Sequence, residues 1–129
     1  MSSFPEDLYY SKDHEWARLD GDLVTVGITH HAVEQLGEIT YVGLPQEDDD
    51  VEKDEVFGSI ESVKAQSDLS SPVSGTVVKV NEELEDAPEL VNQDPYEKGW
   101  MIKVEVSGAD DLDELMDAKE YMKFIAEEE

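Results

Sequence analysis

The fold is decided by the stretch Gly58-Ser59-Ile60-Glu61-Ser62-Val63-Lys64-Ala65, which is followed by Ser71-Pro72-Val73-Ser74-Gly75. Residues 55–62 and 65–70 are both short strand candidates with almost no chain between them, so they are expected to form a hairpin with Lys64 at its tip. Proline holds Ser71 extended and Gly75 is expected to take a positive φ, which predicts a bend after the second strand. A lysine at such a tip projects its amine into water, where another enzyme can grasp and acylate it.

Outward from this hairpin, the chain continues the pattern of short strands and few helices. Thr29 is expected to cap a short helix that ends at Gly37, and residues 89–91 are expected to form one further helical turn. Apolar residues at steps of three and four predict a C-terminal helix whose single apolar face packs on its own domain, namely Leu112, Leu115, Ala118, Met122 and Ile125. The remaining strand candidates are residues 14–20, 23–28, 39–44, 76–80 and 100–106. This order predicts a mainly β sandwich or barrel, in one domain over residues 1–129.

Composition limits the partners of the chain. It has nine basic and 34 acidic residues and a net charge of −25, which argues against nucleic acid or an anionic membrane as a partner held by charge. No apolar stretch approaches the ~18 residues needed to span a bilayer. Cysteine is absent, which excludes disulfides and cysteine metal sites. Residues 56–81 hold two acidic and two basic side chains, and this neutral stretch fits core strands, a working face kept free of excess charge, or both.

Catalytic signatures are poor. His30 and His31 would point about 100° apart on a helix and chelate badly, so these two and His14 are expected to be surface histidines, with no metal site. There is no Ser-His-Asp order and no glycine-rich phosphate loop. The chain is therefore predicted not to be an enzyme in its own right.

The residues around Lys64 resemble the lipoyl-lysine site of the glycine cleavage H-protein family. The likeness runs from about Tyr9 to Phe124 and includes, in order, His14-Glu15-Trp16, Val26-Gly27-Ile28-Thr29, Leu36-Gly37, Leu90-Val91-Asn92, Asp94-Pro95-Tyr96 and Gly99-Trp100-Met101. Two positions depart from the family pattern. His30 stands where the family often has aspartate, and Glu97 where it often has glycine.

This resemblance implies a barrel-sandwich hybrid of the lipoyl/biotinyl-carrier type, with a short internal helix and a C-terminal helix. It implies a non-catalytic carrier, with lipoate attached covalently to Lys64. By the family's analogy, the carrier takes the aminomethyl group of glycine from a pyridoxal-phosphate decarboxylase (P protein) to a tetrahydrofolate-dependent aminomethyltransferase (T protein). A dihydrolipoyl dehydrogenase (L protein) then reoxidises it, and lipoate-attaching enzymes modify it. The expected protein is a monomer in the cytoplasm of a bacterium or archaeon, or in the mitochondrial matrix if the chain is a mature eukaryotic form.

A resting pocket for the loaded arm is a further expectation. Glu15 and Asp68 match family positions near the arm and would hold the ammonium of the cargo, because an unpaired buried charge is costly. Ile28 would help to exclude water. The alternative is that both carboxylates are merely solvated or act as caps.

Three other kinds of carrier are alternatives to this family. A biotin carrier usually has methionine on both sides of its lysine, and a lipoyl domain of a 2-oxo acid dehydrogenase typically has aspartate before it. Val63 and Ala65 argue against the first. The second is typically followed by a long linker, whereas here Val63 precedes the lysine and a helix is expected at the C-terminal end. A related relay protein that donates its lipoyl group to other carriers stays open from the sequence.

Overall fold

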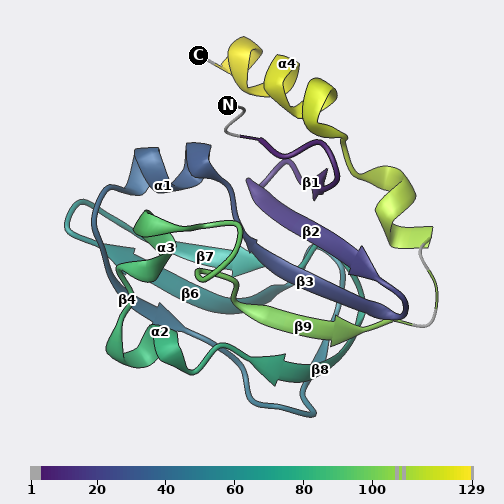
Figure 1. Ribbon diagram of the computed structural model, residues 1–129, viewed down its shortest axis with the longest axis horizontal. Coiled ribbons are helices and arrows are strands. Elements are labelled where there is room, and N and C mark those ends of the chain that lie inside the picture. The colour runs from purple at the N-terminus through teal and green to yellow at the C-terminus, as the bar shows by residue number, and fades with distance from the viewer. Residues whose placement is uncertain (1–3, 107, 109, 129) are drawn as a thin grey trace.

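The computed structural model describes residues 4–106, 108 and 110–128, and its strands form two sheets (Figure 1). The larger sheet has the strand order β1-β2-β3-β9-β8-β5, the smaller one has the order β4-β6-β7, and all neighbouring strands are antiparallel. The strands are β1 (Tyr9–Tyr10), β2 (Glu15–Asp20), β3 (Leu23–Ile28), β4 (Ile39–Gly43), β5 (Asp50–Val51), β6 (Val56–Ser62), β7 (Gln66–Ser70), β8 (Gly75–Val80) and β9 (Ile102–Glu105). The helices are α1 (His30–Leu36), α2 (Glu83–Asp86), α3 (Leu90–Gln93), the 3-10 helix η1 (Asp110–Glu114) and α4 (Ala118–Glu128).

Local signals set the bounds of α1 as the sequence predicts. The Thr29 hydroxyl accepts a hydrogen bond from the amide of Ala32 at 3.2 Å, which satisfies a free donor of the first turn. At the other end, Gly37 has φ 80° and its amide donates to the carbonyl of Val33 at 2.9 Å. The helix therefore stops at a residue that tolerates the left-handed region.

One continuous core joins the two sheets. Buried residues of the larger sheet form one cluster, and those of the smaller sheet form a second cluster with side chains from α1, α2 and α3. Leu44 and Phe57 pack against both clusters. The β6–β7 hairpin therefore rests on a packed hydrophobic core.

The predicted C-terminal face packs on the domain at Leu112, Leu115, Ala118 and Ile125, but not at Met122. Met122 is 42% exposed, whereas Tyr121, which the stripe omits, is fully buried. No single helix spans the predicted stripe, because Met116, which lies between η1 and α4, forms an isolated bridge with Tyr10 on β1. Helix α4 then restarts at a capping box, in which the Glu120 amide donates to the Asp117 carboxylate at 2.8 Å and the Asp117 amide donates to Glu120 at 3.1 Å. Because α4 begins at this new cap, the residues that it turns toward β1 do not follow the predicted spacing.

Three elements and one turn geometry were not predicted. Strands β1 and β5 have two residues each, and α2 is a single turn. Gly75 is not one of the described glycines with a positive φ, so that expectation is wrong. A Cβ at this position would lie 2.2 Å from the carbonyl oxygen of Glu105. Glycine is needed there because β8 and β9 approach closely.

Candidate functional site

Lys64 lies at the tip of the β6–β7 hairpin and is exposed. The Ser62 amide donates to the carbonyl of Ala65 at 2.8 Å, and the Ser62 hydroxyl accepts from the amides of Lys64 at 3.3 Å and Ala65 at 3.1 Å. Serine at the start of a tight turn commonly satisfies the turn amides in this way. The backbone that carries Lys64 is therefore held by its own turn.

A second contact braces the hairpin tip against the corner between α1 and β4. The amide of Val63 donates to the carbonyl of Glu38 at 3.1 Å. Asn92 on α3 fixes this corner, since its side chain donates to the carbonyl of Gly37 at 2.8 Å and accepts from the amide of Ile39 at 2.9 Å. The sequence does not predict these bracing contacts, although Leu36-Gly37 and Leu90-Val91-Asn92 are among the segments that resemble the family.

Gly37 also leaves room for the lysine. A Cβ at Gly37 would lie 2.8 Å from Cε of Lys64, which is closer than carbon atoms pack. The aliphatic stem of Lys64 thus passes over the bare backbone of Gly37, and its Nζ is not held by a carboxylate within 4 Å among the described residues.

We expect Gly37→Ala to slow modification of Lys64 and to destabilise the fold by about 1–2 kcal/mol through backbone strain. Gly21→Ala is the matched control, because Gly21 has φ 65° with nothing within 4 Å of a built Cβ. Comparing the rates at which a lipoate-attaching enzyme modifies the two variants separates strain from crowding of Lys64. Equal rates would mean that the space over Gly37 has no part in presenting the lysine.

Glu15 is a buried carboxyl group at the start of β2. It is 2% exposed, and its oxygens accept hydrogen bonds from the Ser11 hydroxyl at 2.8 Å and the Ser70 amide at 3.1 Å. Burial raises the pKa of Glu15 to about 8, against the lowering effect of those two hydrogen bonds. Glu15 is therefore largely protonated in the folded protein at neutral pH.

The other two predicted pocket residues differ in how the structure relates them to Glu15. Ile28 is directly opposite Glu15 in the β2–β3 pairing and is 3% exposed. Asp68 is exposed on β7, two residues before Ser70, whose amide Glu15 binds. The structure thus brings Glu15 and Ile28 together in a buried position, with Asp68 at the surface of the strand that Glu15 contacts.

Replacing Glu15 with glutamine is expected to change how stability depends on pH. Since folding raises the pKa of Glu15 from 4.5 to about 8, the folded protein holds a proton in this interval that the unfolded chain releases. The contribution of this group to the free energy of unfolding is therefore full below pH 4.5 and falls as pH rises to 8. As the pH rises from 5 to 8, the free energy of unfolding of the Glu15→Gln protein should increase by roughly 2–4 kcal/mol relative to that of the wild type, measured by urea unfolding. Parallel pH profiles of the two proteins would mean that Glu15 titrates normally.

The histidines lie partly where they were not expected. His30 is half-buried and pairs with Glu34 at 2.9 Å, but His31 is 8% exposed and its Nε2 has no hydrogen-bond partner among the described residues. The expectation of a surface residue is thus wrong for His31. His14 is half-buried rather than exposed, and its Nδ1 lies 2.7 Å from the Tyr121 hydroxyl. Within the described ranges, no three His, Cys, Asp or Glu side chains are arranged to hold a metal ion.

Comparison with known proteins gives the family. The model of the glycine cleavage H-protein family matches residues 8–128. The chain belongs to the glycine cleavage H-protein family. It is 56% identical over 128 residues to the glycine cleavage system H protein of Halalkalibacterium halodurans, covering 99% of this chain and 100% of that one. It is 54% identical over 123 residues to the H protein of Staphylococcus carnosus, covering 95% and 98% of the two chains.

A solved H protein has the same fold. The crystal structure of a glycine cleavage system H protein from Mycobacterium marinum matches with a TM-score of 0.88 and 39% identity, over 95% of this chain and 99% of that chain. The predicted barrel-sandwich fold with a C-terminal helix is confirmed. As a member of this family, the chain is a lipoyl carrier of the glycine cleavage system and not one of its catalysts.

The source of the relatives bears on location. The relatives named above are bacterial, so they give no support to the mitochondrial alternative. Among the described residues, no helix combines the length and the apolar character needed to cross a bilayer.

Proposed function

We propose that Lys64 is the residue that carries lipoate, through an amide bond between its Nζ and the carboxyl group of lipoate. The observation that carries the proposal is the braced, exposed turn 62–65, which offers this amine at the tip of a hairpin. Other lysines are less suited. Lys53 is paired with Glu114, and Lys79 lies within β8.

Peptide mapping by tandem mass spectrometry, on protein from cells that express lipoate-attaching enzymes, tests this assignment. We expect the lipoyl group on Lys64. A lipoyl group on Lys53 or Lys79 would overturn the assignment, while leaving the family membership as it is.

We further propose that this single domain, as a monomer, serves the enzymes of the glycine cleavage system in turn. The lipoyl group supplies a disulfide that accepts the aminomethyl group of glycine and passes it on. The specific partners are a pyridoxal-phosphate decarboxylase, a tetrahydrofolate-dependent aminomethyltransferase, a dihydrolipoyl dehydrogenase and the lipoate-attaching enzymes. The chain itself places the lysine: the turn 62–65 and the Glu38 carbonyl fix the backbone, and Gly37 leaves the stem free to turn.

The end of β7 is the proposed resting place of the cargo. An extended lipoyl-lysine reaches about 14 Å from the backbone when its bonds are about 1.5 Å long. Asp68 is four residues from Lys64, which is at most about 14 Å along a strand, so the arm can reach it. The Ser70 amide that Glu15 binds is two residues further along β7, so the Glu15 side chain would have to extend back toward Asp68 to meet the ammonium group. An ammonium group beside Glu15 would lower the pKa of that carboxyl group, so the protonated acid would ionise and pair with the charge.

Exchanging both carboxylates for amides is expected to shorten the lifetime of the aminomethylated protein. Glu15→Gln with Asp68→Asn should leave attachment of lipoate intact but speed spontaneous release of ammonia about tenfold, which corresponds to about 1.4 kcal/mol. The release is followed by an ammonia assay on the isolated loaded protein. Glu85→Gln with Asp86→Asn on α2 is a control that makes the same two kinds of substitution at the surface. An unchanged lifetime in the first variant would exclude the pocket.

A further inference from the structure

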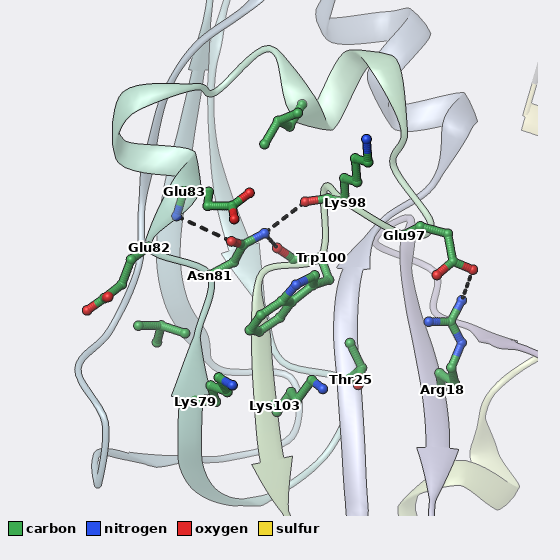
Figure 2. A pocket seen from close by; sticks show the side chains of 12 residues that line it. Arg18, Thr25, Lys79, Asn81, Glu82, Glu83, Glu97, Lys98, Trp100 and Lys103 are labelled. Atoms are coloured by element: carbon green, nitrogen blue, oxygen red, sulfur yellow. Dashed lines mark hydrogen bonds and ion pairs between the residues drawn. The ribbon is translucent and has the colours of Figure 1, made fainter.

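A cavity of about 920 Å³ is lined by residues of β2, β3, β8 and β9 and of the segment between β8 and β9, and by none of the Lys64 hairpin (Figure 2). Its lining, here called the basic groove, includes four of the nine basic residues of the chain but three of its 34 acidic residues. The basic members are Arg18, Lys79, Lys98 and Lys103, and the acidic members are Glu82, Glu83 and Glu97. A protein of net charge −25 therefore gathers nearly half of its positive charge around one concavity.

Two of these lysines are directly opposite each other. Lys79 on β8 is the pairing partner of Lys103 on β9, and Figure 2 shows their side chains next to one another. Like charges in this position destabilise a sheet. Neither ammonium group has a carboxylate within 4 Å among the described residues, although acids outnumber bases almost four to one. Lys103 has only the Trp100 ring as a partner for its charge among these contacts, so the fold supplies no carboxylate for either cation within the described residues.

The groove is built on a fixed frame. The side chain of Asn81 is 5% exposed and donates to the carbonyls of Lys98 at 2.9 Å and Trp100 at 2.8 Å, which ties the loop before β9 to the end of β8. Trp100 is half-buried, and Nζ of Lys103 lies 5.3 Å from its ring centroid. Arg18 is held by the Tyr96 carbonyl at 2.9 Å and by Glu97 at 3.4 Å.

We propose that the basic groove binds an extended acidic peptide segment of a partner protein. This goes beyond the proposed function, since it involves neither Lys64 nor the lipoyl group. Charge complementarity favours it, because this is the surface where anionic side chains meet unpaired cations. Trp100, Val80 and Leu90 add apolar contact to the groove.

A compact anion fits the groove less well. Sites for phosphate usually converge backbone N–H groups on one point, whereas here the cations come from β2, β8, β9 and a loop. Figure 2 shows Lys98 at the opposite end of the groove from Lys79 and Lys103. The glutamates of the lining would repel a concentrated negative charge, but separated carboxylates along a peptide can avoid them.

The test is a titration of the full, unlipoylated protein with a hexaglutamate peptide, followed by two-dimensional ¹⁵N–¹H NMR. At about 0.1 M salt, repulsion from the rest of the protein is screened beyond about 10 Å, while contacts within the groove remain. We expect the shifts to concentrate at the Trp100 indole N–H and the amides of Asn81 and Lys103. Inorganic phosphate in a parallel titration should give weaker shifts.

Two variants with equal charge decide the result. Lys79→Gln with Lys103→Gln should weaken hexaglutamate binding about tenfold, and it should fold because it relieves a like-charge pair. Lys119→Gln with Lys123→Gln, on the exposed side of α4, should bind like the wild type. The proposal is overturned if both variants bind equally, if the peptide shifts residues elsewhere or none, or if phosphate binds as well as the peptide.

Discussion

Replacing Lys64 with arginine is expected to abolish both lipoate attachment and carriage of the aminomethyl group. Arginine keeps the positive charge and a long stem, but its guanidinium stays protonated and is not a nucleophile for amide formation. Lys64 is exposed, and among the described residues its Nζ has no carboxylate within 4 Å, so the free energy of unfolding should change by less than about 0.5 kcal/mol. The loss would therefore be one of chemistry and not of folding.

The measurements are intact mass after co-expression with lipoate-attaching enzymes, and glycine decarboxylation with the partner enzymes supplied. Lys53→Arg and Lys79→Arg are matched controls and should be modified and active like the wild type. Residual carriage by the Lys64→Arg protein, or loss of it in a control, would place the attachment on another lysine.

The parts of the fold that depend on neighbouring residues could be predicted from the sequence. Thr29 and Gly37 bound α1 through hydrogen bonds that span three or four residues, and the β6–β7 hairpin needs only two strands with no chain between them. Lys64 at the tip follows from the same local geometry. These elements are confirmed because nothing distant competes with the local preference.

Elements that depend on distant contacts could not be predicted. Strands β1 and β5 are too short to show a period, and they exist because Tyr10 pairs with Trp16 and Val51 with Gly75. Gly75 is required by the carbonyl of Glu105, thirty residues away in the chain. The pocket residues were named through a family likeness, but the Ser70 amide that binds Glu15 is visible only in the structure.

The C-terminal helix illustrates the limit of periodicity. Steps of three and four identify an apolar face. They cannot say which residues lie at its centre when the helix is interrupted and a second helix begins at a new cap. Tyr121 rather than Met122 is buried, because its ring stacks on Tyr10 with centroids 4.8 Å apart and an angle of 11°. Its hydroxyl also lies 2.8 Å from that of Thr29, the cap of α1, and 2.7 Å from Nδ1 of His14. One side chain thus joins α4, β1 and the start of α1.

Replacing Tyr121 with alanine should therefore destabilise the protein by about 3–5 kcal/mol, the range for removing a buried aromatic ring, measured by urea unfolding with circular dichroism. Tyr121→Phe should lose about 1–2 kcal/mol, because the hydroxyls and ring nitrogen that meet at this point would lose a common partner. Met122→Ala, on the same turn but 42% exposed, should change stability by less than about 1 kcal/mol. If Tyr121→Ala and Met122→Ala were equally mild, α4 would not be docked on β1. The helix would then contribute little to the stability of the domain, and the His14–Thr29–Tyr121 contacts would have no part in holding the start of β2, where Glu15 lies.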